Sequence, residues 1–233
     1  MSVAFQLLKL ENAFVVDSCD EKLPTAFYSW KDDSIELSGG GTHFGYIFKG
    51  NSTLKTNLGS FALREKMFFC VPDSFMIEGG EGIIITRIGF KGMFSIGGQI
   101  EETGRLRYID GCRDSLLIPP ILKGAPCLNA LYFPPNITQT PHTHPSVRVG
   151  MVAKGRGECV TIERVFPLEK GSAFIIPPEA LHSFNTYDDE MVVIAYHPDS
   201  DFGATHEEHP MINRTIIDGV SAAKLDNIRT KGD

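Results

Sequence analysis

Short runs of alternating apolar and polar residues, separated by turn residues, make up most of the chain. Residues 147–153 read Val-Arg-Val-Gly-Met-Val-Ala, with an apolar residue at every second position, and a turn follows at Lys154-Gly155-Arg156-Gly157. Such alternation is typical of a β-strand with one face on a hydrophobic core. Long amphipathic helical periods are absent outside the C-terminal region. The pattern therefore predicts an all-β protein, built as a sandwich or a barrel.

The pattern repeats once along the chain. At a constant offset of 105 residues, as between Gly45 and Gly150, identical residues recur without a gap. The other matched pairs are Lys49 and Lys154, Gly50 and Gly155, Thr56 and Thr161, Phe61 and Phe166, Leu63 and Leu168, Phe69 and Phe174, and Pro72 and Pro177. Because an internal repeat reflects a duplicated structural unit, we expect two similar β units in tandem.

Composition limits the partners of the protein. Its 233 residues, of which 42% are hydrophobic, suffice for one large β domain or two small ones. The net charge of −7 disfavours nucleic acid and anionic membrane surfaces as partners, because both attract basic patches. No apolar run approaches the ~20 residues of a membrane helix, and the first residues do not resemble a signal peptide. We expect a cytoplasmic protein.

The five cysteines are scattered and form no Cys-x-x-Cys motif. An odd number of separated cysteines fits reduced thiols, mostly buried as small apolar side chains. We therefore expect five free thiols and no structural disulfide. The sequence leaves both a monomer and a homodimer open.

Three of the seven histidines lie in one region, at His142, His144 and His182. In an extended strand, residues two apart point to the same side, so His142 and His144 would aim their imidazoles at one point. Neutral imidazole is a ligand for zinc, iron, copper and nickel. Two surface histidines flanked by prolines would give the same local pattern, so the pair alone leaves both interpretations open.

The wider spacing resembles the two sequence motifs of the cupin superfamily, G-x5-H-x-H-x3-4-E-x6-G and G-x5-P-x-G-x2-H-x3-N. The matching residues, spread over about fifty positions, are His142, His144, Gly155, Gly171, Pro177 and His182. Three positions depart from the motifs: Arg148 replaces the glutamate, Glu179 replaces a glycine, and Asn185 comes one position early.

The resemblance implies a double-stranded β-helix, the jelly-roll barrel of cupins, here twice in tandem. It also implies one divalent transition metal on His142, His144 and His182, with iron as the first choice and zinc, nickel and manganese left open. At the 105-residue offset these histidines fall on Leu37, Gly39 and Ile77, none of which is a metal ligand. We therefore expect a metal only in the C-terminal barrel.

Four regions are expected along the chain. Residues 1–98 would form a degenerate N-terminal barrel, 99–126 a linker, 127–200 the metal-binding C-terminal barrel, and 201–233 a C-terminal extension. In the extension, His206 and His209 flank two glutamates. That group fits either a second metal site or a solvated acidic loop.

Arg148 stands where cupins carry a glutamate ligand. If its side chain points into the barrel, the guanidinium would bind a carboxylate or phosphate of the ligand beside the metal. The apolar alternation predicts instead that Val147 and Val149 face inward and Arg148 outward. The cupin register favours the first orientation, and on it Arg148 is expected to bind the substrate.

The function implied by the resemblance is a metal-dependent enzyme, an oxidoreductase of the non-haem iron dioxygenase type, acting on a small anionic molecule such as a carboxylate. Three histidines leave coordination positions for substrate and O₂. Two alternatives stay open: a metal-dependent isomerase, lyase or cyclase on a sugar or polyketide, and a non-catalytic small-molecule-binding or sensor cupin.

Overall fold

The computed structural model describes residues 5–8, 10, 15–16, 20, 22–200 and 214–226. Their regular structure is almost all β, as predicted, and it includes the short 3-10 turns η1 (Ile109–Gly111) and η2 (Ala222–Lys224). No helix in the described part of the chain has the length and hydrophobicity needed to cross a membrane. The chain divides into two compact units, Met1–Ser200 and Asp201–Asp233.

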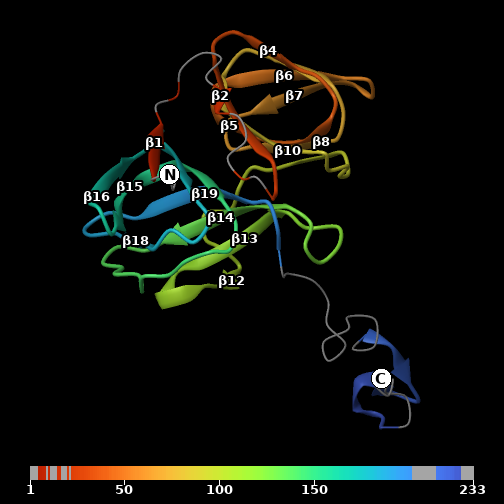
Figure 1. Ribbon diagram of the computed structural model, residues 1–233. Helices are drawn as coiled ribbons and strands as arrows, with labels where there is room; N and C mark the ends of the chain where they lie inside the picture. Colours follow the sequence, from red (N-terminus) through yellow and green to blue (C-terminus); the bar gives the residue numbers. More distant parts are fainter. Residues whose placement is uncertain are drawn as a thin grey trace. The chain divides into compact units, whose positions relative to one another are not determined.

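The N-terminal half, residues 15–97, forms two antiparallel sheets (Figure 1). The six-stranded sheet has the order β11-β8-β5-β10-β3-β2, and the four-stranded sheet has the order β4-β9-β6-β7. The strands are β2 (Val15–Val16), β3 (Thr25–Lys31), β4 (Ser34–Leu37), β5 (Gly41–Lys49), β6 (Asn51–Thr56), β7 (Gly59–Arg64), β8 (Phe68–Val71), β9 (Phe75–Glu78), β10 (Glu81–Ile88) and β11 (Ser95–Gly97). Their apolar side chains, among them Trp30, Phe69 and Ile77, pack into one core.

The C-terminal half contains a nine-stranded sheet with the order β1-β17-β15-β19-β14-β13-β12, in which β16 and β18 also pair with β15. Its strands are β1 (Gln6–Leu8), β12 (Leu106–Arg107), β13 (Arg113–Ile118), β14 (Cys127–Phe133), β15 (Arg148–Thr161), β16 (Val165–Glu169), β17 (Ala173–Ile176), β18 (His182–Asn185) and β19 (Met191–His197). Strand β1 thus joins the C-terminal half through β17, and two strands of the sheet, β12 and β13, come from the segment expected as a linker.

The repeated glycines and phenylalanines make the same cross-strand contact in both halves. Gly45 of β5 pairs with Phe69 of β8, and a Cβ atom at Gly45 would lie 2.1 Å from the Phe69 ring. Gly150 of β15 pairs with Phe174 of β17, and a Cβ atom there would lie 2.4 Å from the ring. In each half the glycine leaves room for the aromatic ring that covers it.

Strand β15 is buried on both faces near its start, and this decides the orientation of Arg148. Val149 and Met151 share a hydrophobic core with Phe44 and Tyr46 of the N-terminal half. The side chain of Arg148, on the other face, is only 13% exposed. The apolar alternation therefore marks packing between the two halves, and the outward orientation it suggested for Arg148 is wrong.

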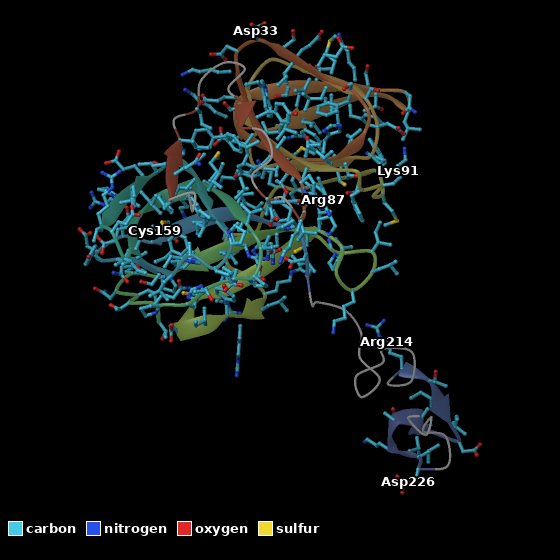
Figure 2. All side chains as sticks on the ribbon, in the orientation of Figure 1. Asp33, Arg87, Lys91, Cys159, Arg214 and Asp226 are labelled. Atoms are coloured by element: carbon cyan, nitrogen blue, oxygen red, sulfur yellow. The ribbon has the colours of Figure 1, made fainter. Side chains whose placement is uncertain are left out.

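The cysteines that the structure describes are free thiols. Cys70, Cys112, Cys127 and Cys159 are all buried, and Figure 2 shows Cys159 among the packed side chains of the C-terminal half. Burial raises the pKa of the Cys112 thiol to about 11. Cys19 lies outside the described residues, as do His206 and His209.

The unit Asp201–Asp233 is described from residue 214 to residue 226. Within that range β20 (Ile216–Ile217) pairs with β21 (Val220–Ser221) in a two-stranded sheet. The turn η2 follows directly.

Candidate metal centre

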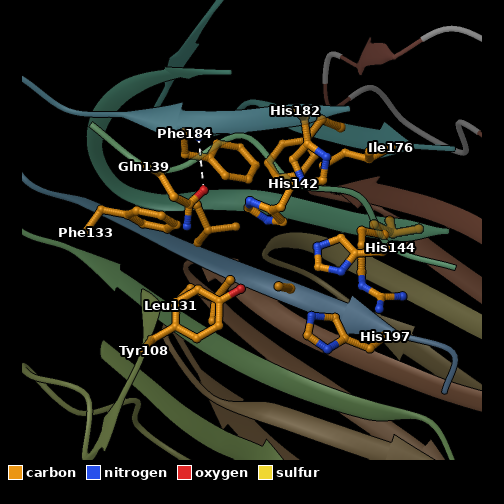
Figure 3. Close-up of a pocket in the computed structure, with 15 residues that line it drawn as sticks. Tyr108, Leu131, Phe133, Gln139, His142, His144, Ile176, His182, Phe184 and His197 are labelled. Atoms are coloured by element: carbon orange, nitrogen blue, oxygen red, sulfur yellow. Dashed lines mark hydrogen bonds between the residues drawn. The ribbon is translucent and has the colours of Figure 1, made fainter. Parts of the chain in front are cut away.

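A short backbone bridge brings the predicted histidines together. The N–H of His142 donates to the carbonyl of His182 at 2.9 Å, and the N–H of His182 donates back at 3.0 Å. His144 lies two residues further along the same extended segment. Figure 3 shows the three imidazoles turned toward one another, with Tyr108 and His197 below them in this view. One ligating nitrogen from each ring lies within 4.8 Å of the other two.

Backbone carbonyls fix the tautomer of two of these rings. Nδ1 of His142 lies 2.8 Å from the carbonyl oxygen of Thr140, and Nδ1 of His182 lies 2.9 Å from that of Ala180. A carbonyl can only accept, so each Nδ1 carries the proton and donates it. Nε2 is then left with a free lone pair, which is the usual arrangement of a metal-ligating histidine.

Burial keeps the imidazoles of His144 and His182 neutral. It lowers the pKa of His144 to about 3, and the positive charge of Arg148 acts in the same direction. Burial also lowers the pKa of His182 to about 4, against the opposing effect of the hydrogen bond to Ala180. Histidines that are neutral at pH 7 are in the form that binds metal.

The three side chains fit a divalent transition metal. Nitrogens that share one ion at about 2.1 Å lie roughly 3–3.5 Å apart, and small ring rotations bring atoms within 4.8 Å to that spacing. Three imidazole ligands suit iron, zinc or nickel better than calcium or magnesium, which prefer oxygen. Within the described part of the chain, this is the group of ligating side chains close enough to hold an ion.

The histidines open on a cavity of about 30 Å³. Its walls are mostly apolar and include the rings of Phe133, Phe174 and Phe184. The polar side chains that line it, besides the three histidines, are Tyr108, Gln139, Arg148 and His197. The cavity therefore combines a candidate metal site with an apolar wall and a few oriented polar groups, as ligand sites commonly do.

Arg148 lines this cavity and is paired with an acidic side chain at its edge. Its Nη1 donates to Oδ1 of Asp199 at 3.3 Å and to Oγ of Ser146 at 2.5 Å. Burial lowers the pKa of Arg148, while Asp199 opposes that shift. A guanidinium stays charged in proteins, so the cavity contains one fixed positive charge.

Three polar residues of the cavity escaped prediction from the sequence. His197 ends β19, and all the residues before it in that strand are hydrophobic. The strand therefore has no alternation of polar and apolar residues that would indicate which side chains face the cavity. Burial lowers the pKa of His197 well below the usual value. Gln139 accepts a hydrogen bond at 3.1 Å from the N–H of Phe184 (Figure 3), and Tyr108 precedes η1 in an irregular segment. For His197, the one feature of the sequence that could have indicated a functional role is its position as a polar residue at the end of an apolar strand.

Comparisons with known proteins agree with this geometry. The cupin domain family model matches residues 131–197, which span β19 and all three histidines. No curated protein sequence matches the chain.

Solved structures share the fold at low sequence identity. A putative glyoxylate-induced protein from Pseudomonas aeruginosa has a TM-score of 0.67 and 10% identity, covering 88% of this chain and 92% of its own. Protein Ylba from E. coli has a TM-score of 0.63 and 16% identity, covering 88% and 96%. A salicylate 1,2-dioxygenase from Pseudaminobacter salicylatoxidans has a TM-score of 0.63 and 9% identity, covering 84% of both chains. The family match therefore identifies residues 131–197 as a cupin domain, and the solved structures show that the wider fold is shared.

Proposed function

We propose that the protein is a metal-dependent enzyme that acts on a small anionic organic substrate in a dioxygenase-type reaction. The observation that carries this proposal is the convergence of three imidazoles on one point at an apolar cavity. A bound iron ion would supply redox chemistry with O₂ there, because three histidine ligands leave coordination positions open.

Each group of residues has a distinct role in this proposal. His142, His144 and His182 hold the metal. Phe133, Phe174 and Phe184 exclude water from the reacting end of the cavity, which strengthens the electrostatic interactions inside it. Arg148 binds the anionic group of the substrate. One of the solved structures with this fold is a salicylate 1,2-dioxygenase in complex with gentisate, which supports a small acid as the ligand.

We also propose that the protein is a bicupin, with barrels centred on residues 1–98 and 127–200, and with β1, β12 and β13 added to the sheet of the second barrel. The matched contacts of Gly45 with Phe69 and of Gly150 with Phe174 support it. In the first barrel, Leu37, Gly39 and Ile77 stand at the positions of the metal ligands. The first barrel would then have a structural role, and the chemistry would be confined to the second.

Oxygen uptake tests the reaction type. The purified protein is loaded without oxygen with Fe²⁺, Zn²⁺, Ni²⁺ or Mn²⁺, and O₂ consumption is followed over a panel of aromatic and keto acids. We expect consumption with the iron form and at least one acid, and none with His144→Ala. Substrate conversion by the zinc or nickel form without O₂ would contradict the dioxygenase proposal and favour an isomerase or lyase.

A further inference from the structure

The guanidinium of Arg148 uses one of its nitrogens and leaves another unpaired. Its contacts to the described residues all go through Nη1, which donates to Oγ of Ser146, to Oδ1 of Asp199, and to the carbonyls of Ser146 and Val147 at 3.3 and 3.0 Å. Nε is buried and has no hydrogen-bond partner within the described part of the chain. A buried donor on a charged group is costly to leave unpaired. We therefore expect a ligand in the cavity that Arg148 lines to accept a hydrogen bond from Nε.

Ser146 and Asp199 form a closed arrangement around Nη1. The hydroxyl of Ser146 accepts from Nη1 and donates to Oδ1 of Asp199 at 2.5 Å, and the same Oδ1 also accepts from Nη1. Ser146 is 2% exposed, so its hydroxyl has little freedom to turn away. Because Nη1 contacts a hydroxyl, a carboxylate and two backbone carbonyls, rotation of the planar guanidinium about its last side-chain bonds would break these contacts.

The free edge of the guanidinium has a defined shape. Nε–H and one N–H of Nη2 point in the same direction, so together they match the two oxygens of a carboxylate in a side-on bidentate pair. The cavity is about 30 Å³, more than the ~10–15 Å³ of one water, and most of its wall is apolar. These dimensions favour a small carboxylic acid over a phosphate ester.

We propose that Asp199 and Ser146 are positioning residues that hold Nη1 and so present the Nε–Nη2 edge of Arg148 for side-on binding of a carboxylate. This inference rests on the proposed function, since it gives the anionic substrate its chemical class and orientation. Asp199 and Ser146 do not touch the substrate; they act through Arg148.

The test compares a planar anion with a spherical one. Thermal unfolding of the full-length, zinc-loaded protein is followed in sodium acetate and in sodium chloride at matched ionic strength. Stabilisation at each concentration gives a dissociation constant for each anion. Only acetate can accept from both N–H groups of the oriented edge. The ratio of the chloride and acetate dissociation constants therefore reports the orientation of Arg148. A change of charge alone would change both dissociation constants by the same factor.

We expect the wild-type protein to prefer acetate. Ser146→Ala, which changes no charge, should reduce that preference about tenfold, the effect of losing one charge-assisted hydrogen bond. Asp199→Asn should raise the affinity for both anions through its lost charge and reduce the preference similarly. Asp199→Glu should recover part of it. Asp188→Asn is the matched control, because Asp188 accepts at 3.3 Å from Arg156 on the exposed surface.

The outcomes separate this inference from the function on which it rests. A wild-type protein without acetate preference, or an Arg148→Gln variant that keeps it, would overturn both the anion site and the inference. A preference that is lost in Arg148→Gln but unchanged in Ser146→Ala and Asp199→Asn would overturn the inference alone. If Asp199→Asn fails to fold, the Ser146→Ala result decides.

Discussion

Two backbone carbonyls, those of Thr140 and Ala180, decide which ring nitrogen of His142 and His182 is free to bind metal. Surface histidines flanked by prolines would have water as partner at both ring nitrogens. Fixed tautomers and burial therefore favour the ligand interpretation over the surface interpretation of the same sequence pattern.

His43 gives a prediction for the pH dependence of stability. It is 2% exposed, and burial lowers its pKa to about 4. Between pH 6.5 and 4 the unfolded chain binds a proton that the folded His43 does not, so the free energy of unfolding falls as the pH falls. This difference in proton binding lowers the free energy of unfolding by up to about 3 kcal/mol. Urea denaturation of the wild type and of His43→Gln at pH 7 and 4.5 measures it.

The variant should lose less stability on acidification than the wild type. An equal loss in both proteins would mean that His43 is protonated in the folded state. Gln is a suitable replacement because its amide can still reach the hydroxyl of Thr86, which lies 2.7 Å from Nδ1 of His43.

At the residue scale, motif spacing predicted which histidines would meet. The bridge between His142 and His182 explains how they come together, because it pairs the segment that contains His142 and His144 with the start of β18. Neither Asp199 nor His197 could be predicted to lie beside Arg148, because nothing in the local sequence relates the end of β19 and the residues after it to the start of β15. The orientation of Arg148 required knowing that both faces of β15 are covered.

At the scale of strands, the glycine beneath each phenylalanine gives a test of packing. Gly150→Ala places a methyl group 2.4 Å from the buried ring of Phe174, so the ring or the strand must move. Such overpacking costs about 1–3 kcal/mol. Gly39→Ala is the control, since a Cβ there would lie 3.7 Å from Oγ of Ser74, an ordinary contact. Chemical denaturation compares the two variants, and equal stabilities would contradict the packing argument.

The repeat predicted some strands closely and others poorly. Shifting β8 by the 105-residue offset gives residues 173–176, which are the bounds of β17. The same shift applied to β10 gives a start at 186, whereas β19 begins at Met191. The identities end at Pro72 and Pro177, and beyond them the two halves have connections of different length. The pairing of β1 with β17 could not be predicted, because three residues carry too little pattern.

At the scale of the whole molecule, the two halves of the unit Met1–Ser200 share one hydrophobic core. Phe44 of the N-terminal half packs on Tyr196 of the C-terminal half with ring centroids 5.2 Å apart. We predict that both halves unfold together, and that Phe44→Ala destabilises them by about 3–5 kcal/mol.

The single tryptophan, Trp30, makes this measurable. Its fluorescence reports the N-terminal half, and zinc release reports the C-terminal half. In a urea titration we expect the two signals to change at the same concentration and to shift together in Phe44→Ala. Separate transitions would show that the halves are independent.

Thiol counting addresses the redox state of the whole chain. We predict five free cysteines when the protein is denatured without reductant, because the four that the structure describes are unpaired and buried. A count of three or fewer would reveal a disulfide and contradict the predicted cytoplasmic location.

Metal content tests the central claim most directly. The wild-type protein and His144→Ala are purified in parallel and analysed for transition metals, with His43→Gln as a control for a buried histidine outside the site. We predict one ion per chain in the wild type and in His43→Gln, and almost none in His144→Ala. One ion per chain in His144→Ala would show that the metal is bound elsewhere and would contradict the account.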